Sequence, residues 1–222
     1  EIMMPMRPFF GPLQFSAEFI YTALILVLCF LIHRRTGEMY ELTRHNGIKY
    51  FRNAFLFFGF AYLTRFLLHL YMISNIATGM MLQKRIIQPP LIAVTGYFST
   101  MAIFFLLYCT IWKRTEHRNF FIFSNVIALI MSVTAFFMRT PFILPALQFI
   151  LLVFSVALIF GKRHKKVSHI RPLYLLLLVF WLVNMFVVGP RRLVPFQAKI
   201  VFQLISLAVF YAIYYKVSKW TK

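Results

Sequence analysis

The sequence predicts an all-α integral membrane protein, a bundle of seven transmembrane helices with its N-terminus outside and its C-terminus in the cytoplasm. Three observations predict it: the composition, seven long apolar segments, and basic residues that alternate between the connections. Of 222 residues, 61% are hydrophobic and only 13% are charged. Average soluble domains are about half apolar and about a quarter charged. A soluble fold could not bury this much apolar surface, whereas lipid can cover it.

Seven apolar segments are long enough to cross a bilayer, which takes about twenty residues of helix. The first follows Pro12, and because the residues before it lack a basic stretch and a cleavage site, we expect it to be retained as a helix. Proline opens the third, fifth, sixth and seventh segments, where its missing N–H costs nothing. The whole chain, 1–222, is predicted to be one seven-helix domain with helices at about 13–32, 51–73, 90–112, 120–138, 141–160, 172–188 and 195–215.

The orientation follows from the positions of Lys and Arg. Sixteen of the 24 lie in the connections after the first, third and fifth segments and in the C-terminal tail, and Arg65 lies within a segment. Connections rich in Lys and Arg stay in the cytoplasm. This predicts a multi-pass protein of the cell membrane, N-terminus outside. The connection 33–50 is the longest cytoplasmic loop, and it could form a short interfacial helix.

The net charge of +19 leaves only five acidic residues. Because the basic residues cluster between apolar segments, we expect them to attract anionic lipid head groups and not nucleic acid. Cys29 and Cys109 lie in apolar runs and are expected to be reduced packing residues. No metal-binding spacing occurs, the chain has no Asp, and a single acid in the predicted spans cannot form a catalytic pair. We therefore expect no catalytic residues and no metal. A function other than catalysis is favoured, and the alternative is an enzyme that uses Cys109 or His69 alone.

Three ionisable residues fall in the outer halves of the first two predicted helices. Glu18 is the only acid in a span, and Arg65 could meet it at a similar depth. We predict a Glu18–Arg65 pair, either as a folding staple or as part of a functional site. His69 lies four residues after Arg65 and so shares its helix face. It could act as a pH sensor or proton relay, or be a neutral side chain hydrogen-bonded to a neighbouring helix.

Further polar residues lie at the same predicted level. If Gln148, Asn184, Gln197, Lys199 and Gln203 face inward, they form with Arg65 an electropositive cavity open to the outside. Such a cavity would bind an anionic or carboxylate-bearing ligand or a lipid head group. The alternative is that the amides join helices and Lys199 extends to the interface. The predicted ligand-binding residues are Glu18, Arg65, His69, Gln148, Asn184, Lys199 and Gln203, with Arg139, Arg191 and Arg192 at the rim.

Short sequence matches indicate an internal repeat. The stretch PLQF at 12–15 is similar to PALQF at 145–149, and Pro90 and Ala93 are spaced like Pro195 and Ala198. These matches would relate the first three helices to the last three in a parallel repeat, with the fourth helix between them. The alternative is chance similarity between sequences rich in Leu and Phe.

Two resemblances to known families follow from specific stretches. AKIVF at 198–202 is similar to the region around the retinal-bearing lysine of microbial rhodopsins, but the third helix lacks a counter-ion carboxylate. We therefore expect no retinal on Lys199 and no other cofactor. ELTRHNGIKYFRNAFLFFGF at 41–60 and GYFSTMA at 96–102 resemble uncharacterised archaeal seven-helix membrane proteins. Some similar modules are the membrane input of sensor kinases, which implies a sensing or scaffold role.

The sequence leaves three functions open. The first is a receptor or sensor-like module that binds its ligand in the outer half and passes a helix shift to a separate cytoplasmic signalling protein. The second is a small transporter or channel built from three-helix repeats, although the Pro-Gln pairs of seven-helix sugar carriers are missing. The third is a structural membrane subunit. A homo-oligomer is compatible with each.

Overall fold

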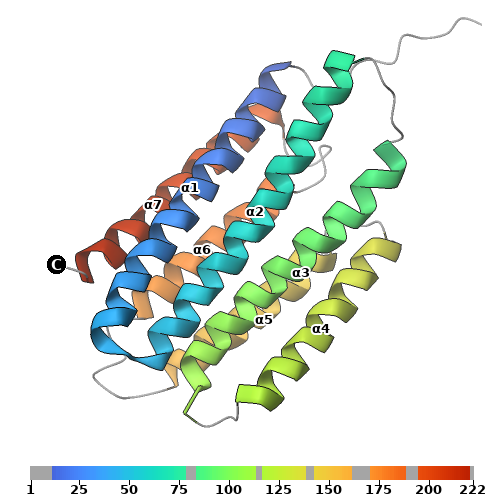
Figure 1. Ribbon diagram of the computed structural model, residues 1–222. Helices are drawn as coiled ribbons and strands as arrows, with labels where there is room; N and C mark the ends of the chain where they lie inside the picture. The colour runs from blue at the N-terminus through green and yellow to red at the C-terminus, as the bar shows by residue number, and fades with distance from the viewer. Residues whose placement is uncertain are drawn as a thin grey trace, which may run out of the picture.

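The computed structural model shows an all-helical chain, as predicted (Figure 1). It describes residues 12–78, 84–113, 117–138, 143–161, 171–188 and 195–220. Six of the described helices are long and apolar enough to cross a membrane, and α6 has a shorter apolar stretch, Arg171–Val187. The helices are α1 (Pro12–Thr43), α2 (Asn46–Thr78), α3 (Lys84–Ile111), α4 (His117–Met138), α5 (Ile143–Phe160), α6 (Arg171–Val188) and α7 (Phe196–Trp220).

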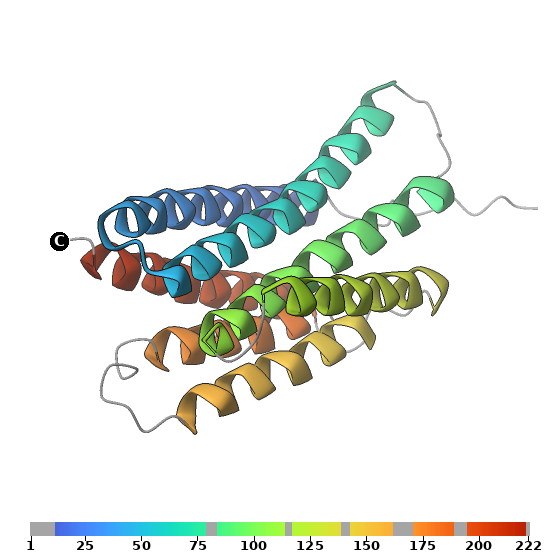
Figure 2. The same ribbon diagram turned by 60° about the horizontal axis from the view of Figure 1, so that its bottom comes forward.

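Six helices form a closed ring, and α4 lies outside it. Neighbours around the ring are α1 and α2, α2 and α3, α3 and α5, α5 and α6, α6 and α7, and α7 and α1. Figures 1 and 2 show α4 at the edge of the bundle, beside α3. Exchanging α1 with α5, α2 with α6 and α3 with α7 leaves the list of ring neighbours unchanged. The ring therefore has the neighbour pattern of two parallel three-helix units.

The connection 33–50 was predicted as a loop that could form a short interfacial helix, but it is almost entirely an extension of α1 and α2. α1 continues to Thr43, and α2 begins at Asn46. Arg34 and Arg35 reach Glu38 at 3.8 and 3.0 Å, and pairs at this spacing support a helix beyond the apolar segment. The chain reverses at Arg44, whose φ of 50° lies in the left-handed region that ends helices.

The N-terminus of α2 is capped by a side chain that the sequence did not point to. Nδ1 of His45 accepts the backbone N–H of Gly47 at 3.1 Å, which satisfies one of the free amides of the first turn. The ring of His45 also packs edge-on against Trp112 at 5.5 Å. His45 thus joins the start of α2 to the end of α3.

The prolines mark the helix starts only in part. Pro195 immediately precedes α7, where its carbonyl accepts the N–H of Lys199 at 3.1 Å. Pro89 and Pro90, by contrast, lie inside α3, which begins at Lys84 and not at residue 90. Proline cannot donate the intrahelical hydrogen bond, so the start of α3 forgoes two such bonds.

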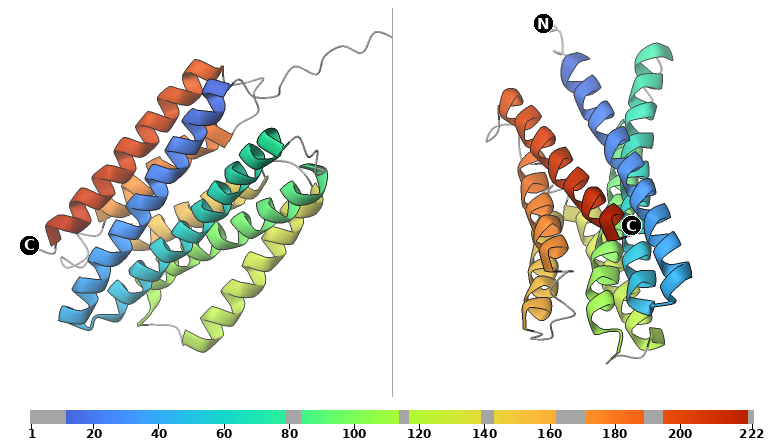
Figure 3. Two further views of the ribbon diagram at one scale, coloured as in Figure 1. Left: turned by 45° about the horizontal axis from the view of Figure 1, so that its top comes forward. Right: turned by 90° about the vertical axis from the view of Figure 1, so that its left-hand side faces the viewer.

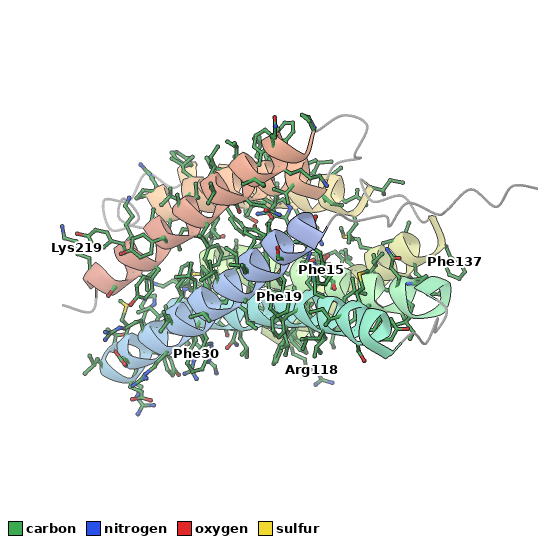
Figure 4. The ribbon with its side chains drawn as sticks, turned by 90° about the horizontal axis from the view of Figure 1, so that it is seen from above. Phe15, Phe19, Phe30, Arg118, Phe137 and Lys219 are labelled. Atoms are coloured by element: carbon green, nitrogen blue, oxygen red, sulfur yellow. The ribbon has the colours of Figure 1, made fainter. Side chains whose placement is uncertain are left out.

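The outer faces of the bundle are apolar. Phe30 on α1 is 63% exposed and Phe137 near the end of α4 is 74% exposed, and Figure 4 labels both. Side chains of this size are rarely left in water in such numbers. The interior is also apolar, with fully buried Phe55, Phe180 and Phe210 in ring contact. A bundle that is apolar on both sides fits a bilayer.

Candidate functional site

All seven predicted site residues lie toward one end of the bundle, which we call the N-terminal end. Because consecutive helices run in opposite directions, this end holds the starts of α1, α3, α5 and α7 and the ends of α2, α4 and α6 (Figure 3). Arg65 and His69 are late in α2, Gln148 is early in α5 and Asn184 is late in α6. The structure nevertheless divides them: three line a cavity, and the other four lie on α1, α2 and α7 outside its wall.

The cavity has a volume of about 260 Å³ and lies between α2, α3, α5 and α6, with one residue from α4. Three predicted site residues line it, Arg65, Gln148 and Asn184. Glu18, His69, Lys199 and Gln203 are absent from its wall. The wall is otherwise mostly apolar and includes Phe58, Leu68, Leu91, Leu144, Trp181 and Met185.

Gln148 joins α5 to α3 at the wall of the cavity. Its Nε2 lies 2.7 Å from the hydroxyl of Ser99, 2.9 Å from that of Thr100 and 3.3 Å from the carbonyl of Gly96. The side chain is 3% exposed. The helices approach closely here because position 96 is glycine: a Cβ at Gly96 would lie 2.7 Å from a methyl of Leu144.

Asn184 is the centre of a network that joins four helices. Its Oδ1 accepts hydrogen bonds from Tyr21 of α1 at 3.0 Å and from Tyr62 of α2 at 3.4 Å. Its Nδ2 donates to Ser206 of α7 at 3.1 Å, and the Ser206 and Tyr21 hydroxyls are 2.8 Å apart. The three hydroxyls were not predicted as site residues, because Tyr and Ser in apolar runs are more often packing residues.

Glu18 pairs with His69 and not with the predicted partner, Arg65. Glu18 Oε2 lies 3.6 Å from Nε2 of His69, whose ring is buried and also packs at 5.6 Å from the ring of Phe15. The other ring nitrogen of His69, Nδ1, lies 2.7 Å from the backbone carbonyl of Arg65. A carbonyl oxygen only accepts, so Nδ1 carries a proton.

Two basic residues, Arg65 on α2 and Lys199 on α7, lie near this pair. Both lie close enough to Glu18 to act on its charge. The Arg65 guanidinium is 5.8 Å from the centre of the Tyr62 ring. Lys199 and Gln203 are buried on α7, with exposed fractions of 8% and 6%. The predicted rim residues Arg139, Arg191 and Arg192 lie outside the described residues.

Two polar contacts outside the predicted site also join helices. Asn125 of α4 accepts a hydrogen bond from Tyr97 of α3 at 2.5 Å. Cys29 is buried, the Cys109 thiol donates to the carbonyl of Gly47 at 3.1 Å, and neither cysteine forms a disulfide. Within the described ranges, no three His, Cys, Asp or Glu side chains are grouped to hold a metal ion.

Comparison with known proteins gives one relative. An uncharacterized protein of Archaeoglobus fulgidus is 33% identical over 222 aligned residues, which cover 95% of each chain. The chain belongs to the same family as this archaeal protein. No protein-family profile matches the chain, and no solved structure matches it. The established description is therefore a multi-span helical membrane protein with an archaeal relative.

Proposed function

We propose that the chain is a receptor or sensor-like membrane module that binds a small amphipathic anion in the cavity. The observation that carries the proposal is Arg65, a permanent cation in a wall that is mostly apolar. The volume of about 260 Å³ is just below the range of about 300–1,000 Å³ that is usual for small-molecule sites. A short alkyl chain with one anionic group has matching chemistry.

The balance of charge at this end of the bundle supports an anionic ligand. Arg65 and Lys199 are both near Glu18, which is the only acidic residue at the N-terminal end of the described helices. Two basic side chains, one of them the permanently charged Arg65, therefore face one carboxylate. A charge inside a membrane protein is costly when it is not compensated. An anion beside Arg65 would supply the compensating charge.

Two polar groups in the wall would add direction to the binding. Gln148 and Asn184 line the same cavity as Arg65, and both are held by hydrogen bonds to other helices. Side chains held in this way present fixed donors and acceptors to a ligand. Since the wall is built from helices of both three-helix units, a bound ligand would change the fit between them. A separate cytoplasmic protein would sense the resulting helix shift.

The test uses Trp181 as a reporter, since its ring lines the cavity. Substitutions Trp112→Phe and Trp220→Phe leave it as the only tryptophan of the three in the chain. The protein is placed in phospholipid nanodiscs and titrated with bromodecyl sulfonate, whose bromine quenches tryptophan on contact. Bromodecanol, with the same chain and no charge, is the control ligand.

We expect saturable quenching by the sulfonate and binding of the alcohol that is weaker by about tenfold or more, because a hydrogen bond to a charged group contributes about 1.5–3 kcal/mol. Arg65→Gln should reduce sulfonate binding to the level of the alcohol. Arg52→Gln, which removes an arginine at the other end of α2, should leave it unchanged. A second variant keeps Trp112 as its only tryptophan. If both ligands quench Trp112 and Trp181 equally, they reach both tryptophans by partition into the lipid, and the proposal is refuted.

A second candidate is a carrier, and the arrangement of the ring favours it. Two three-helix units with the same neighbour pattern enclose the cavity from both sides. Many transporters consist of such repeats, with the substrate at their interface. Flux of the sulfonate into liposomes, lost in Gln148→Leu, would favour transport. Binding without flux would favour the sensor.

A further inference from the structure

We propose that the Glu18–His69 pair is a proton-binding site that is coupled to the cavity, so that the anion and one proton bind together. This inference rests on the proposed function, because it concerns the ligand of the same cavity. Its basis is the position of the pair: Glu18 on α1 meets His69 on α2, and His69 lies about one helical turn after Arg65.

The geometry of His69 shows where the proton is held. Nδ1 donates to the carbonyl of Arg65 at 2.7 Å, so a neutral ring would turn the lone pair of Nε2 toward Glu18. That nitrogen is 3.6 Å from Oε2 of Glu18. A lone pair facing a carboxylate is repulsive. The contact is favourable only with one more proton on the pair, either on the imidazole or on the carboxyl group.

Arg65 links this proton to the cavity. Its backbone carbonyl orients His69, its side chain lines the cavity, and its charge acts on Glu18. An anion in the cavity would neutralise part of that charge. The carboxylate of Glu18 would then lose a stabilising cation, and the pair would hold its proton more tightly. By linkage, a proton on the pair strengthens anion binding by the same factor.

The groups around the pair are two basic side chains, two tyrosines and the uncharged residues of the cavity wall. Facing the pair are Arg65 on α2 and Lys199 on α7, both cations. The hydroxyls of Tyr21 and Tyr62 donate hydrogen bonds to Asn184. Among the described residues, the cavity wall from α3, α4, α5 and α6 carries no titratable side chain; its polar members are Ser, Thr, Gln and Asn. Glu18 and His69 are therefore the groups expected to exchange the proton.

The consequence for function is specific. A cavity that takes up the anion together with a proton gains no net charge in total. In a sensor this makes ligand affinity depend on pH, and in a carrier it makes the transported pair electroneutral. Moving a net charge through a low-dielectric bundle is costly, and the paired uptake avoids that cost.

The experiment uses the same sole-tryptophan protein and bromodecyl sulfonate, which stays anionic at every pH used. Affinity is measured by Trp181 quenching between about pH 8 and about pH 5, the range in which histidines commonly titrate. We expect the affinity to rise by at least about fivefold at the lower pH, the low end of typical coupling. A pH-indicator dye in weak buffer should report proton uptake when the sulfonate is added near neutral pH.

Two variants of acidic residues on the same helix separate the pair from general effects. Glu18→Gln mimics the protonated carboxyl, so its affinity at the higher pH should match that of the unsubstituted chain at the lower pH, with no proton uptake. Glu38→Gln removes an exposed carboxylate at the other end of α1 and should behave like the unsubstituted chain.

Binding that is equal at both pH values, without proton uptake, would overturn the coupling and leave the proposed function standing. No saturable binding at either pH would overturn the proposed function and the coupling with it. If Glu18→Gln does not fold, proton uptake by the unsubstituted chain decides alone.

Discussion

Asn184 allows a quantitative test of what holds the bundle together. Asn184→Leu keeps a similar side-chain volume and removes three hydrogen bonds between helices, from Tyr21, from Tyr62 and to Ser206. Interhelical hydrogen bonds in membrane proteins average about 0.6 kcal/mol, with a maximum near 1.7 kcal/mol. Three average bonds give a loss of about 2 kcal/mol in the free energy of unfolding.

The matched control is Asn125→Leu. Asn125 also lies in a membrane helix, but it makes one interhelical hydrogen bond, to Tyr97, and its expected loss is about 0.6 kcal/mol. Reversible unfolding in mixed micelles with increasing SDS, followed by circular dichroism, measures both. Equal losses for the two variants would refute the view that the four-helix network contributes more than a single contact.

A second test asks whether Ser206 and Asn184 stabilise the protein together or independently. Ser206 exchanges hydrogen bonds with both Tyr21 and Asn184, so removing it should matter less once Asn184 is already gone. The double variant Asn184→Leu with Ser206→Ala should therefore lose less than the summed losses of the single variants. Strict additivity would show that the two side chains act independently.

Two further predictions concern packing and chemistry of the interior. Phe210→Ala empties a fully buried site beside Phe55 and Phe180, so it should lower the free energy of unfolding by about 3–5 kcal/mol. Phe30→Ala, on the exposed face, should change the free energy of unfolding by less than about 1 kcal/mol in the same assay. Cys29, which is 1% exposed, should resist alkylation by a maleimide in the folded protein and react once SDS unfolds it, as mass spectrometry would show.

The helical fold was predictable because its signal is repeated along the chain. Six of the described helices contain an apolar segment of sufficient length, and the shorter α6 has the same apolar composition. The connection at 33–50 was mispredicted because charged residues such as Arg34, Glu38 and Arg44 are typical of loops in membrane proteins. In this chain they form pairs along a helix that leaves the apolar region, and only the positive φ of Arg44 ends it.

The sequence predicted how far along the helices the candidate site residues lie, but it did not predict which side chains contact one another. Position along each segment placed Glu18, Arg65 and His69 at one end of the bundle, where the structure has them. Arg65 and His69 are four residues apart, so they differ by only about 40° around the helix and about 6 Å along it. Sequence alone could not decide which of them Glu18 meets. It also could not show that α7 places Lys199 beside α1, away from the cavity wall.

Gly96 gives a way to change the cavity without changing its charge. A Cβ at this position would lie 2.7 Å from a methyl of Leu144, a cavity-lining side chain that must then move. Gly96→Ala gains about 1 kcal/mol of helix propensity, so the fold should tolerate the change. We expect weaker quenching of Trp181 by the sulfonate, because the displaced Leu144 alters the cavity.

Adding Leu144→Ala to Gly96→Ala removes the methyl that the new Cβ meets and should restore sulfonate binding. Leu144→Ala alone is the control for the enlarged cavity. Restoration would show that the shape of the wall between α3 and α5 controls access of the alkyl chain, separately from Arg65. If Gly96→Ala binds the sulfonate as well as the unsubstituted chain does, the ligand does not reach this wall, and the cavity's α2 and α6 side must hold it.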